Sequence, residues 1–205
     1  MSRIAVLTGD IVESSALSTA ALDETIAALG AGVADISAWE RGVATGFARQ
    51  AGDGWQAVLD DGRLAVRAAL YLQACVRRLA ADRATRIAVA LGDGDLSPAD
   101  RENPNSATGP AFTASGRLLD GIGRHALMAH AGGGAVAAAL RLADHIAQQW
   151  TQAQARALCE MLVPEAGPRS EAAERLGISR QAVDQALWGA GYPALTEALE
   201  LLEAE

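Results

Sequence analysis

The sequence contains no lysine, few aromatic residues and no long hydrophobic run. All 17 basic residues of the 205-residue chain are arginine, 25 acidic residues outnumber them, and the formal net charge is −8. This balance excludes a chain-wide electrostatic attraction to nucleic acid, so any DNA contact must come from a local surface. No apolar run reaches the roughly 18 residues of a membrane-spanning helix, and no charged-then-apolar leader precedes the first strand. We therefore expect a cytoplasmic protein without a membrane partner.

Cysteine is nearly absent as well. Cys75 and Cys159 each lie within an apolar helical pattern rather than in a spacing typical of metal or disulfide chemistry. We expect both to be buried, reduced thiols. His125 and His130 flank a short predicted strand, but no third ligand is near them in the sequence, so we expect no metal site there.

The order of the predicted elements indicates an α+β fold, with one sheet covered by helices and a small all-α unit after it. Short apolar runs predict strands at 3–8, 43–49, 55–59, 85–91 and 126–129, and Gly52-Asp53-Gly54 predicts a hairpin between the second and third. Helical patterns cover 18–40, capped by Ser18, and 62–81, 110–122 and 135–150. The segment 92–108 is rich in Gly, Pro, Asp and Asn, which predicts a long surface loop.

From Thr151 onward the pattern is helical, and residues 170–187 resemble the helix-turn-helix of many bacterial regulators. Ala172 and Ala173 permit close helix packing, and Gly177 can adopt the positive φ that ends a helix. Ser179 can then cap a second helix, which would enter the major groove of DNA. We expect a shared apolar core from Leu176, Ile178, Val183 and Leu187. The expected DNA-contacting residues are Ser179, Arg180, Gln181, Asp184 and Gln185, because Arg reads guanine and Gln reads adenine.

A packed helical hairpin used for dimerisation is the alternative interpretation of this segment. Residues 151–205 carry four arginines and nine acidic residues, although part of that acidity follows Tyr192, outside the expected reading surface. Phosphate neutralisation supplies much of the affinity for DNA, so we expect a homodimer to be needed. We expect Trp150 and Trp188 in the core of this unit, and Trp55 in the core or in the wall of a site.

Two aspartates are the main candidates for chemistry in the first half of the chain. Asp10 follows the first strand and Asp53 lies in the hairpin turn, so both carboxylates are predicted at the same end of the sheet. Two converging carboxylates are the minimum for holding a divalent cation against nucleotide phosphates. An aspartate in a turn is also common for turn chemistry alone.

Residues 1 to about 130 resemble the class III nucleotide cyclase homology domain, in the shortened form of SatD-like proteins. The resemblance rests on LTGDIVESS at 7–15, GDGWQAV at 52–58, RIAVALG at 86–92 and GPAFTASGRL at 109–118. It implies a cyclase-like, ferredoxin-like sheet in which Asp10 and Asp53 bind a metal such as Mg²⁺ and Ile11 lends its carbonyl. It also implies that Arg117 stabilises phosphate charge, whereas the residue alone is explained by snorkelling or by pairing with Asp120.

The positions that select the base and support cyclisation depart from the family. Arg49 replaces a purine-selecting lysine, the purine-selecting acid falls near Ser106, and Thr113 replaces a helix asparagine. The resemblance therefore implies that metal and nucleotide phosphate binding are retained while base selection and transition-state support are altered.

Together these features predict a transcriptional regulator with a nucleotide-cyclase-like unit at 1–134, a connecting helix at 135–150 and a DNA-binding unit at 151–205. A nucleotide or cyclic nucleotide would bind the homodimer and reposition its helices on double-stranded operator DNA. Two alternatives remain, an active class III cyclase with a regulatory helix-turn-helix tail, and a non-enzymatic interaction protein.

Overall fold

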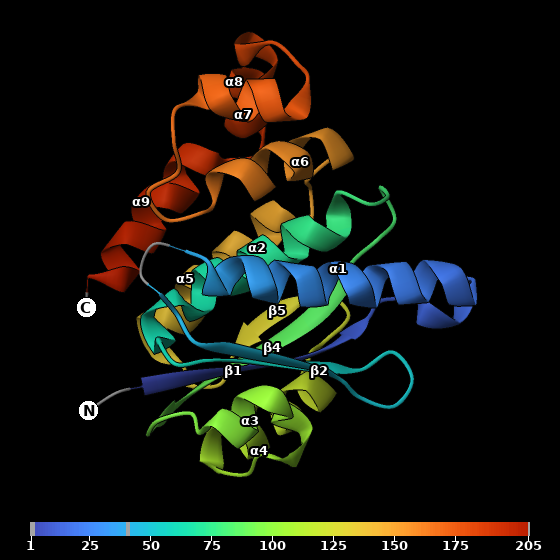
Figure 1. Ribbon diagram of the computed structural model, residues 1–205, viewed down its shortest axis with the longest axis vertical. Coiled ribbons are helices and arrows are strands. Elements are labelled where there is room, and N and C mark those ends of the chain that lie inside the picture. Colours follow the sequence, from blue (N-terminus) through green and yellow to red (C-terminus); the bar gives the residue numbers. More distant parts are fainter. Residues whose placement is uncertain (1–2, 40–41, 205) are drawn as a thin grey trace.

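The computed structural model describes residues 3–39 and 42–204, and a mixed five-stranded sheet lies at the centre of these residues (Figure 1). The strands are β1 (Arg3–Ile11), β2 (Thr45–Arg49), β3 (Trp55–Leu59), β4 (Thr85–Asp93) and β5 (Met128–His130), in the spatial order β2-β3-β1-β4-β5. All neighbours are antiparallel except the parallel pair β4 and β5. Central β1 is apolar because both of its faces are covered, and Ala5, Val6 and Leu7 are fully buried.

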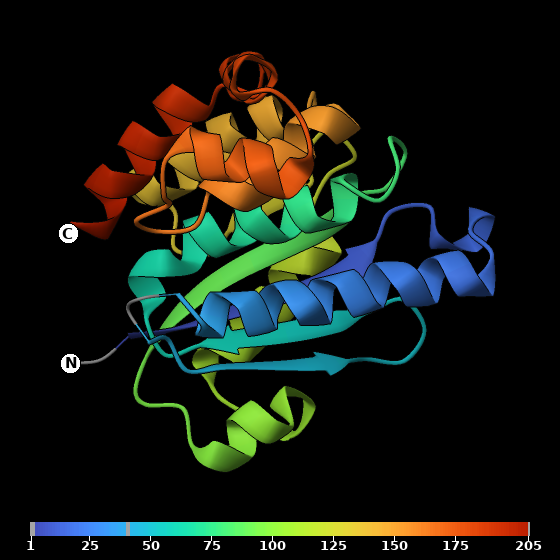
Figure 2. The ribbon, with the colours of Figure 1, turned by 45° about the horizontal axis from the view of Figure 1, so that its top comes forward.

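Helices cover both faces of the sheet. On one face lie α1 (Thr19–Ser37), α2 (Ala65–Arg77) and α5 (Gly134–Ala147), and on the other lie α3 (Pro98–Glu102) and α4 (Pro110–Gly121). A further layer stands on α2 and consists of α6 (Gln152–Met161), α7 (Arg169–Leu176), α8 (Arg180–Gly189) and α9 (Tyr192–Glu203). Figure 2 shows this last layer and the α3–α4 pair on opposite sides of the molecule. The α+β class predicted from the sequence is confirmed.

Local signals placed the capped helix starts correctly, whereas the predicted helix at 62–81 is shorter, at Ala65–Arg77. Ser18 accepts a hydrogen bond from the Ala21 N–H at the start of α1, and Thr151 forms a capping box with Gln154 at the start of α6. The predicted hairpin is present, with Arg49 of β2 opposite Trp55 of β3. The predicted end of the first helix at residue 40 lies outside the described residues.

The prediction of a long loop at 92–108 is wrong in part. Strand β4 continues to Asp93, and α3 and a 3₁₀ turn at Pro104–Ser106 follow. Helix α3 forms because Ser97 and Asp100 make a capping box around Pro98, which occupies the first helical position. This spacing is visible in the sequence, but the high content of loop-forming residues obscured it.

The main hydrophobic core runs without interruption from the sheet into the C-terminal layer. It includes Leu7 of β1, Leu70 of α2, Leu158 of α6, Val183 of α8 and Leu199 of α9. The predicted boundary after residue 134 falls at the first residue of α5 and the one after residue 150 falls between α5 and α6, but the core crosses both. The C-terminal layer is therefore packed on α2 through a shared core.

A buried ion pair fixes the last helix to α2. The Arg67 guanidinium donates to both carboxylate oxygens of Glu203, at 2.5 and 3.2 Å, and to the Leu162 carbonyl at 3.0 Å. Only 5% of the Arg67 side chain and 4% of the Glu203 side chain are exposed. Trp150 is also buried, as predicted, and its indole N–H donates to the Ala190 carbonyl at 3.0 Å.

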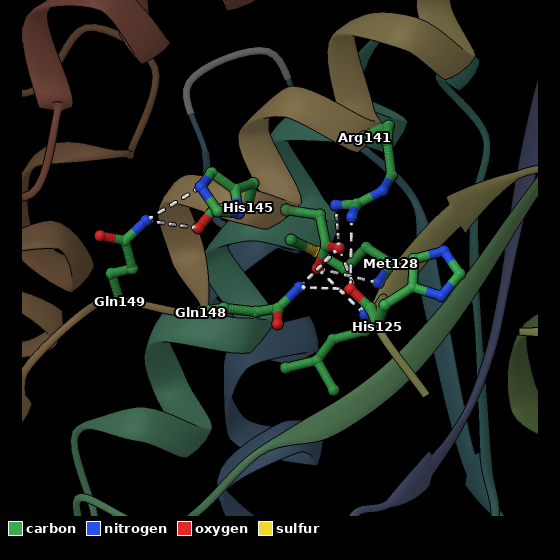
Figure 3. A network of polar contacts seen from close by, with 8 residues as sticks. His125, Met128, Arg141, His145, Gln148 and Gln149 are labelled. Carbon is green, nitrogen blue, oxygen red and sulfur yellow. Dashed lines mark hydrogen bonds and ion pairs between the residues drawn. The ribbon is translucent and has the colours of Figure 1, made fainter. Parts of the chain in front are cut away.

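A second buried carboxylate joins α5 to the start of β5 (Figure 3). Asp144, whose side chain is 0% exposed, accepts hydrogen bonds from the Leu127 and Met128 N–H groups, each at 3.1 Å. Gln148 donates to the same carboxylate at 2.9 Å and Arg141 at 3.0 Å. Burial raises the pKa of Asp144, and these hydrogen bonds oppose that rise. The network holds the edge strand and α5 in one arrangement.

Candidate functional site

The first candidate site is the pair of helices α7 and α8, the segment predicted to be a helix-turn-helix, with α6 packed against both. Gly177 ends α7 in the left-handed conformation, at φ 66°, and the Ile178 N–H closes that end by donating to the Ala173 carbonyl at 3.0 Å. Ser179 then caps α8 by accepting a hydrogen bond from the Ala182 N–H at 3.1 Å. The two helices are thus joined by a three-residue turn, as the sequence predicts.

The interior of this motif is apolar and tightly closed. Ala172, Val183 and Leu187 are 0% exposed, and Leu176 is partly buried against them. Ile178, which was predicted in this core, is instead 46% exposed. Its side chain lies at the solvent edge of the turn because its backbone closes the end of α7.

Helix α8, which carries the predicted DNA-contacting residues after its cap Ser179, lies at the end of the molecule farthest from α3 and α4 (Figure 1). Arg180, Gln181 and Gln185 are exposed, and Arg180 is 72% exposed at its side chain. Ser179 is used as the helix cap. Asp184 accepts a hydrogen bond from Arg169 at 2.7 Å, so its carboxylate is held by an intramolecular ion pair. Arg180 also lies 3.8 Å from the Asp184 carboxylate, whereas Gln181 and Gln185 are exposed polar side chains of α8.

Trp188 extends this face and was assigned wrongly by the sequence analysis. It was predicted in the core, yet it is 78% exposed. Residues 181, 185 and 188 follow the i, i+4, i+7 spacing of one helical face, so Trp188 lies one turn beyond Gln185. The same spacing in the sequence was the signal that could have placed it outside.

Acidic partners neutralise other arginines near the motif. Arg175 donates to Glu160 at 2.5 Å and lies 3.7 Å from Glu171, and Arg169 is bound to Asp184. A DNA phosphate would have to compete with these carboxylates for each guanidinium. The surface can therefore offer few phosphate contacts per chain, in keeping with the net charge of −8.

The second candidate site is the end of the sheet where Asp10 and Asp53 lie. Strand register pairs Gly9 with Trp55, which brings the last residues of β1 beside the β2–β3 turn that carries Asp53. Asp10 stands directly opposite Arg86 of β4, and the Arg86 guanidinium donates to both of its carboxylate oxygens. This hydrogen-bonded pair raises the pKa of Arg86, and the charge of Asp53 adds to the effect. Arg86 was not predicted because its role depends on cross-strand register.

The other predicted nucleotide- and metal-binding residues come from four different elements. Arg49 of β2 donates to Asp23 of α1 at 2.8 Å and to the Gly52 carbonyl at 3.0 Å. Ser106 is exposed in its 3₁₀ turn, Thr113 and Arg117 are exposed on α4, and Ile11 is buried next to Asp10 at the end of β1.

The ligands available to a metal ion at this end of the sheet are few among the described residues. Within residues 3–39 and 42–204, no three His, Cys, Asp or Glu side chains form a group that could hold a metal ion. Both oxygens of Asp10 are already engaged by Arg86. In the arrangement described, Arg86 holds the Asp10 carboxylate, and Asp53 lies in the adjoining turn between β2 and β3.

None of the described helices is both long and apolar enough to cross a membrane. No protein-family model matches the sequence, and no curated protein shows significant similarity to it. The function therefore has to be inferred from the two candidate surfaces.

Proposed function

We propose that this chain is a DNA-binding transcriptional regulator in which α8 enters the major groove. The observation that carries the proposal is the outer face of α8, where Arg180, Gln181 and Gln185 are exposed directly after a capped, three-residue turn. Recognition helices of this type contact base edges through the residues of their first turns. Arg180 suits guanine, and either glutamine suits adenine.

The polarity of the exposed face of α8 also fits DNA recognition better than dimerisation through a helical hairpin. A hairpin that binds a second copy needs an apolar outer face, but the exposed positions at the start of α8 are Arg180 and Gln181. The exposed apolar exceptions are Ile178 in the turn and, at the far end of the helix, Trp188. We propose that the Trp188 ring lies beside the DNA backbone or a thymine methyl group.

Because few arginines are available for phosphates, a single copy should bind weakly. We propose a homodimer that places two α8 helices on half-sites about one helical turn of operator DNA apart. Limited phosphate neutralisation also predicts that affinity falls less steeply with salt than for a strongly basic regulator.

We further propose that the end of the sheet with Asp10 and Asp53 binds a nucleotide or cyclic nucleotide. The order β1-α1-β2-β3-α2-β4, with spatial strand order 2-3-1-4, is that of a ferredoxin-like split β-α-β unit, which supports the resemblance to class III cyclases. Mg²⁺ is proposed here only together with a phosphate, which would take over the Arg86 guanidinium and release Asp10. In that case Asp10, Asp53 and the Ile11 carbonyl would hold the cation and neutralise phosphate charge.

DNA recognition is tested by selecting duplexes from a random-sequence library and measuring their affinity by fluorescence anisotropy. Arg180→Ala and Gln181→Ala should each weaken binding to the selected site about 5- to 150-fold, which corresponds to about 1–3 kcal/mol for one bidentate base contact. Arg124→Ala is the matched control, since Arg124 is exposed in the loop between α4 and β5, far from α8. Equal losses in the control and in both α8 variants would refute the assignment.

Nucleotide binding is tested by thermal shift with a panel of nucleotides and cyclic nucleotides, with and without Mg²⁺. A ligand that binds only the folded chain raises the melting temperature, and Asp53→Asn should reduce the Mg²⁺-dependent part of that rise. Cyclic product formed from ATP or GTP with Mn²⁺ would favour the active cyclase instead. If neither nucleotide nor DNA binds, the chain is a non-enzymatic interaction protein.

A further inference from the structure

Cys75 and Cys159, the only two cysteines of the chain, lie side by side although 84 residues separate them. Cys75 belongs to α2 and Cys159 to α6, and the Cys159 thiol donates to the Cys75 sulfur over 3.9 Å. Both are buried, free thiols, as predicted, but their contact was not predicted. A disulfide bond is about 2.05 Å long, so the sulfurs would have to close by roughly 2 Å, which side-chain rotation across one helix contact can supply.

The pair is accessible from one side only. Cys75 is 0% exposed and has Gly32 of α1 directly behind it, where a Cβ atom would come within 3.1 Å of the Cys75 sulfur. Cys159 is 6% exposed and lines a surface cavity of about 400 Å³ together with Arg78 and Glu160. A small oxidant that enters this cavity therefore reaches the Cys159 sulfur first.

The groups around the two cysteines favour the loss of one proton from the pair, which leaves one thiol and one thiolate. The hydrogen bond from Cys159 lowers the pKa of Cys75, and the Arg78 charge lowers it further against the effect of burial. The same hydrogen bond and burial raise the pKa of Cys159 well above its ordinary value. Cys75 can thus accept the Cys159 proton as the Cys159 sulfur attacks an oxidant. Buried thiols without such a partner are inert.

We propose that Cys75 and Cys159 form a redox-active dithiol site that reduces small hydroperoxides and becomes an intramolecular disulfide between α2 and α6. The Cys159 sulfur attacks the outer peroxide oxygen, the O–O bond breaks, and the alkoxide takes a proton from solvent and leaves as an alcohol. The sulfenic acid on Cys159 is then attacked by the Cys75 sulfur, the S–O bond breaks, and hydroxide leaves with the Cys75 proton as water. One thiol, one thiolate, one hydroperoxide and one proton from solvent give one disulfide, one alcohol and one water, and two electrons pass from sulfur to peroxide.

The disulfide would tie the first helix of the C-terminal layer to the helix layer on the sheet. It closes a loop of 84 residues, which limits the freedom of the unfolded chain far more than that of the folded one. The melting temperature of the oxidised chain should therefore rise by about 5–10 °C, and dithiothreitol should reverse the change.

The test treats the reduced, folded full chain with hydrogen peroxide and follows intact mass, thiol count and melting temperature. The expected result is the loss of two hydrogen atoms and of both titratable thiols, without intermolecular crosslinks. Cys75→Ser and Cys159→Ser should each leave the remaining buried thiol largely unoxidised and should form no intramolecular disulfide, because each variant has lost the partner sulfur.

Two outcomes would overturn the proposal. One is a wild-type chain that keeps both thiols in the folded state and loses them only in urea. The other is a disulfide that forms only between chains. If a serine variant fails to fold, the comparison of wild-type chain in native buffer and in urea still decides.

Discussion

Replacement of Glu203 by alanine should destabilise the whole protein, because it leaves a buried positive charge at the contact between α9 and α2. Arg67 loses both carboxylate contacts, at 2.5 and 3.2 Å, while its side chain stays 5% exposed. Removing one member of a buried ion pair costs about 3–5 kcal/mol. A cavity of about 390 Å³ that both residues line admits water to the stranded guanidinium, which places the expected loss near the lower limit, about 3 kcal/mol.

A loss of about 3 kcal/mol is large compared with a typical free energy of unfolding of about 5–15 kcal/mol, and it should lower the melting temperature by roughly 6–12 °C. Urea denaturation followed by circular dichroism measures the free energy of unfolding. Asp23→Ala is the control, because it breaks the exposed ion pair with Arg49, whose side chains are 54% and 41% exposed, and should cost less than about 1 kcal/mol. A Glu203→Ala loss no greater than that of the control would refute the account of how the C-terminal layer is held.

Three further changes test other parts of the fold. Gly177→Ala should cost about 1 kcal/mol in urea denaturation, because an L side chain is strained at φ 66°, and an unchanged midpoint would contradict the turn geometry. Asp144→Ala should speed hydrogen exchange at the Leu127 and Met128 amides, which lose their acceptor, and exchange as slow as in the wild type would show that the network does not hold β5. Burial lowers the pKa of His130, so the folded chain favours the neutral imidazole. The stability that the neutral imidazole contributes is complete above pH about 6.5 and is lost as the pH falls through the lowered pKa. His130→Asn should flatten this part of the stability profile, and an identical profile in the variant would exclude His130 as its source.

The features that the sequence predicted correctly are those encoded within a few residues. Ser18, Thr151 and Ser179 each cap a helix because a side-chain oxygen reaches the N–H three residues on. Gly177 ends α7 for an equally local reason, the ease of a positive φ without a side chain. These signals need no knowledge of tertiary packing.

The features that were missed depend on contacts between distant residues. Arg67 and Glu203 are 136 residues apart, and the buried charge of each is tolerated only because the other is present. Arg86 meets Asp10 through the register of two antiparallel strands, which hydrophobic patterning does not specify to the residue. Trp188 was predicted in the core because it is apolar, but apolar character alone does not tell which face of a helix is covered.

The candidate sites follow the same division. The two helices α7 and α8 could be predicted because they form a continuous segment whose caps and turn are local. The nucleotide-binding residues were expected from widely spaced motifs, and the structure leaves Arg49 with Asp23 and Thr113 on the surface of α4.

The central claim, that α8 reads base sequence, is tested most directly by a double-mutant cycle between Arg180 and the selected DNA site. Each guanine of the site is replaced in turn, and the affinity of the wild-type chain and of Arg180→Ala is measured by fluorescence anisotropy at one salt concentration. The account predicts one guanine whose replacement costs the wild type about 1–3 kcal/mol but costs Arg180→Ala almost nothing, because the contact is already lost. If every replacement costs the two proteins the same, Arg180 does not read a base and α8 is not the recognition helix.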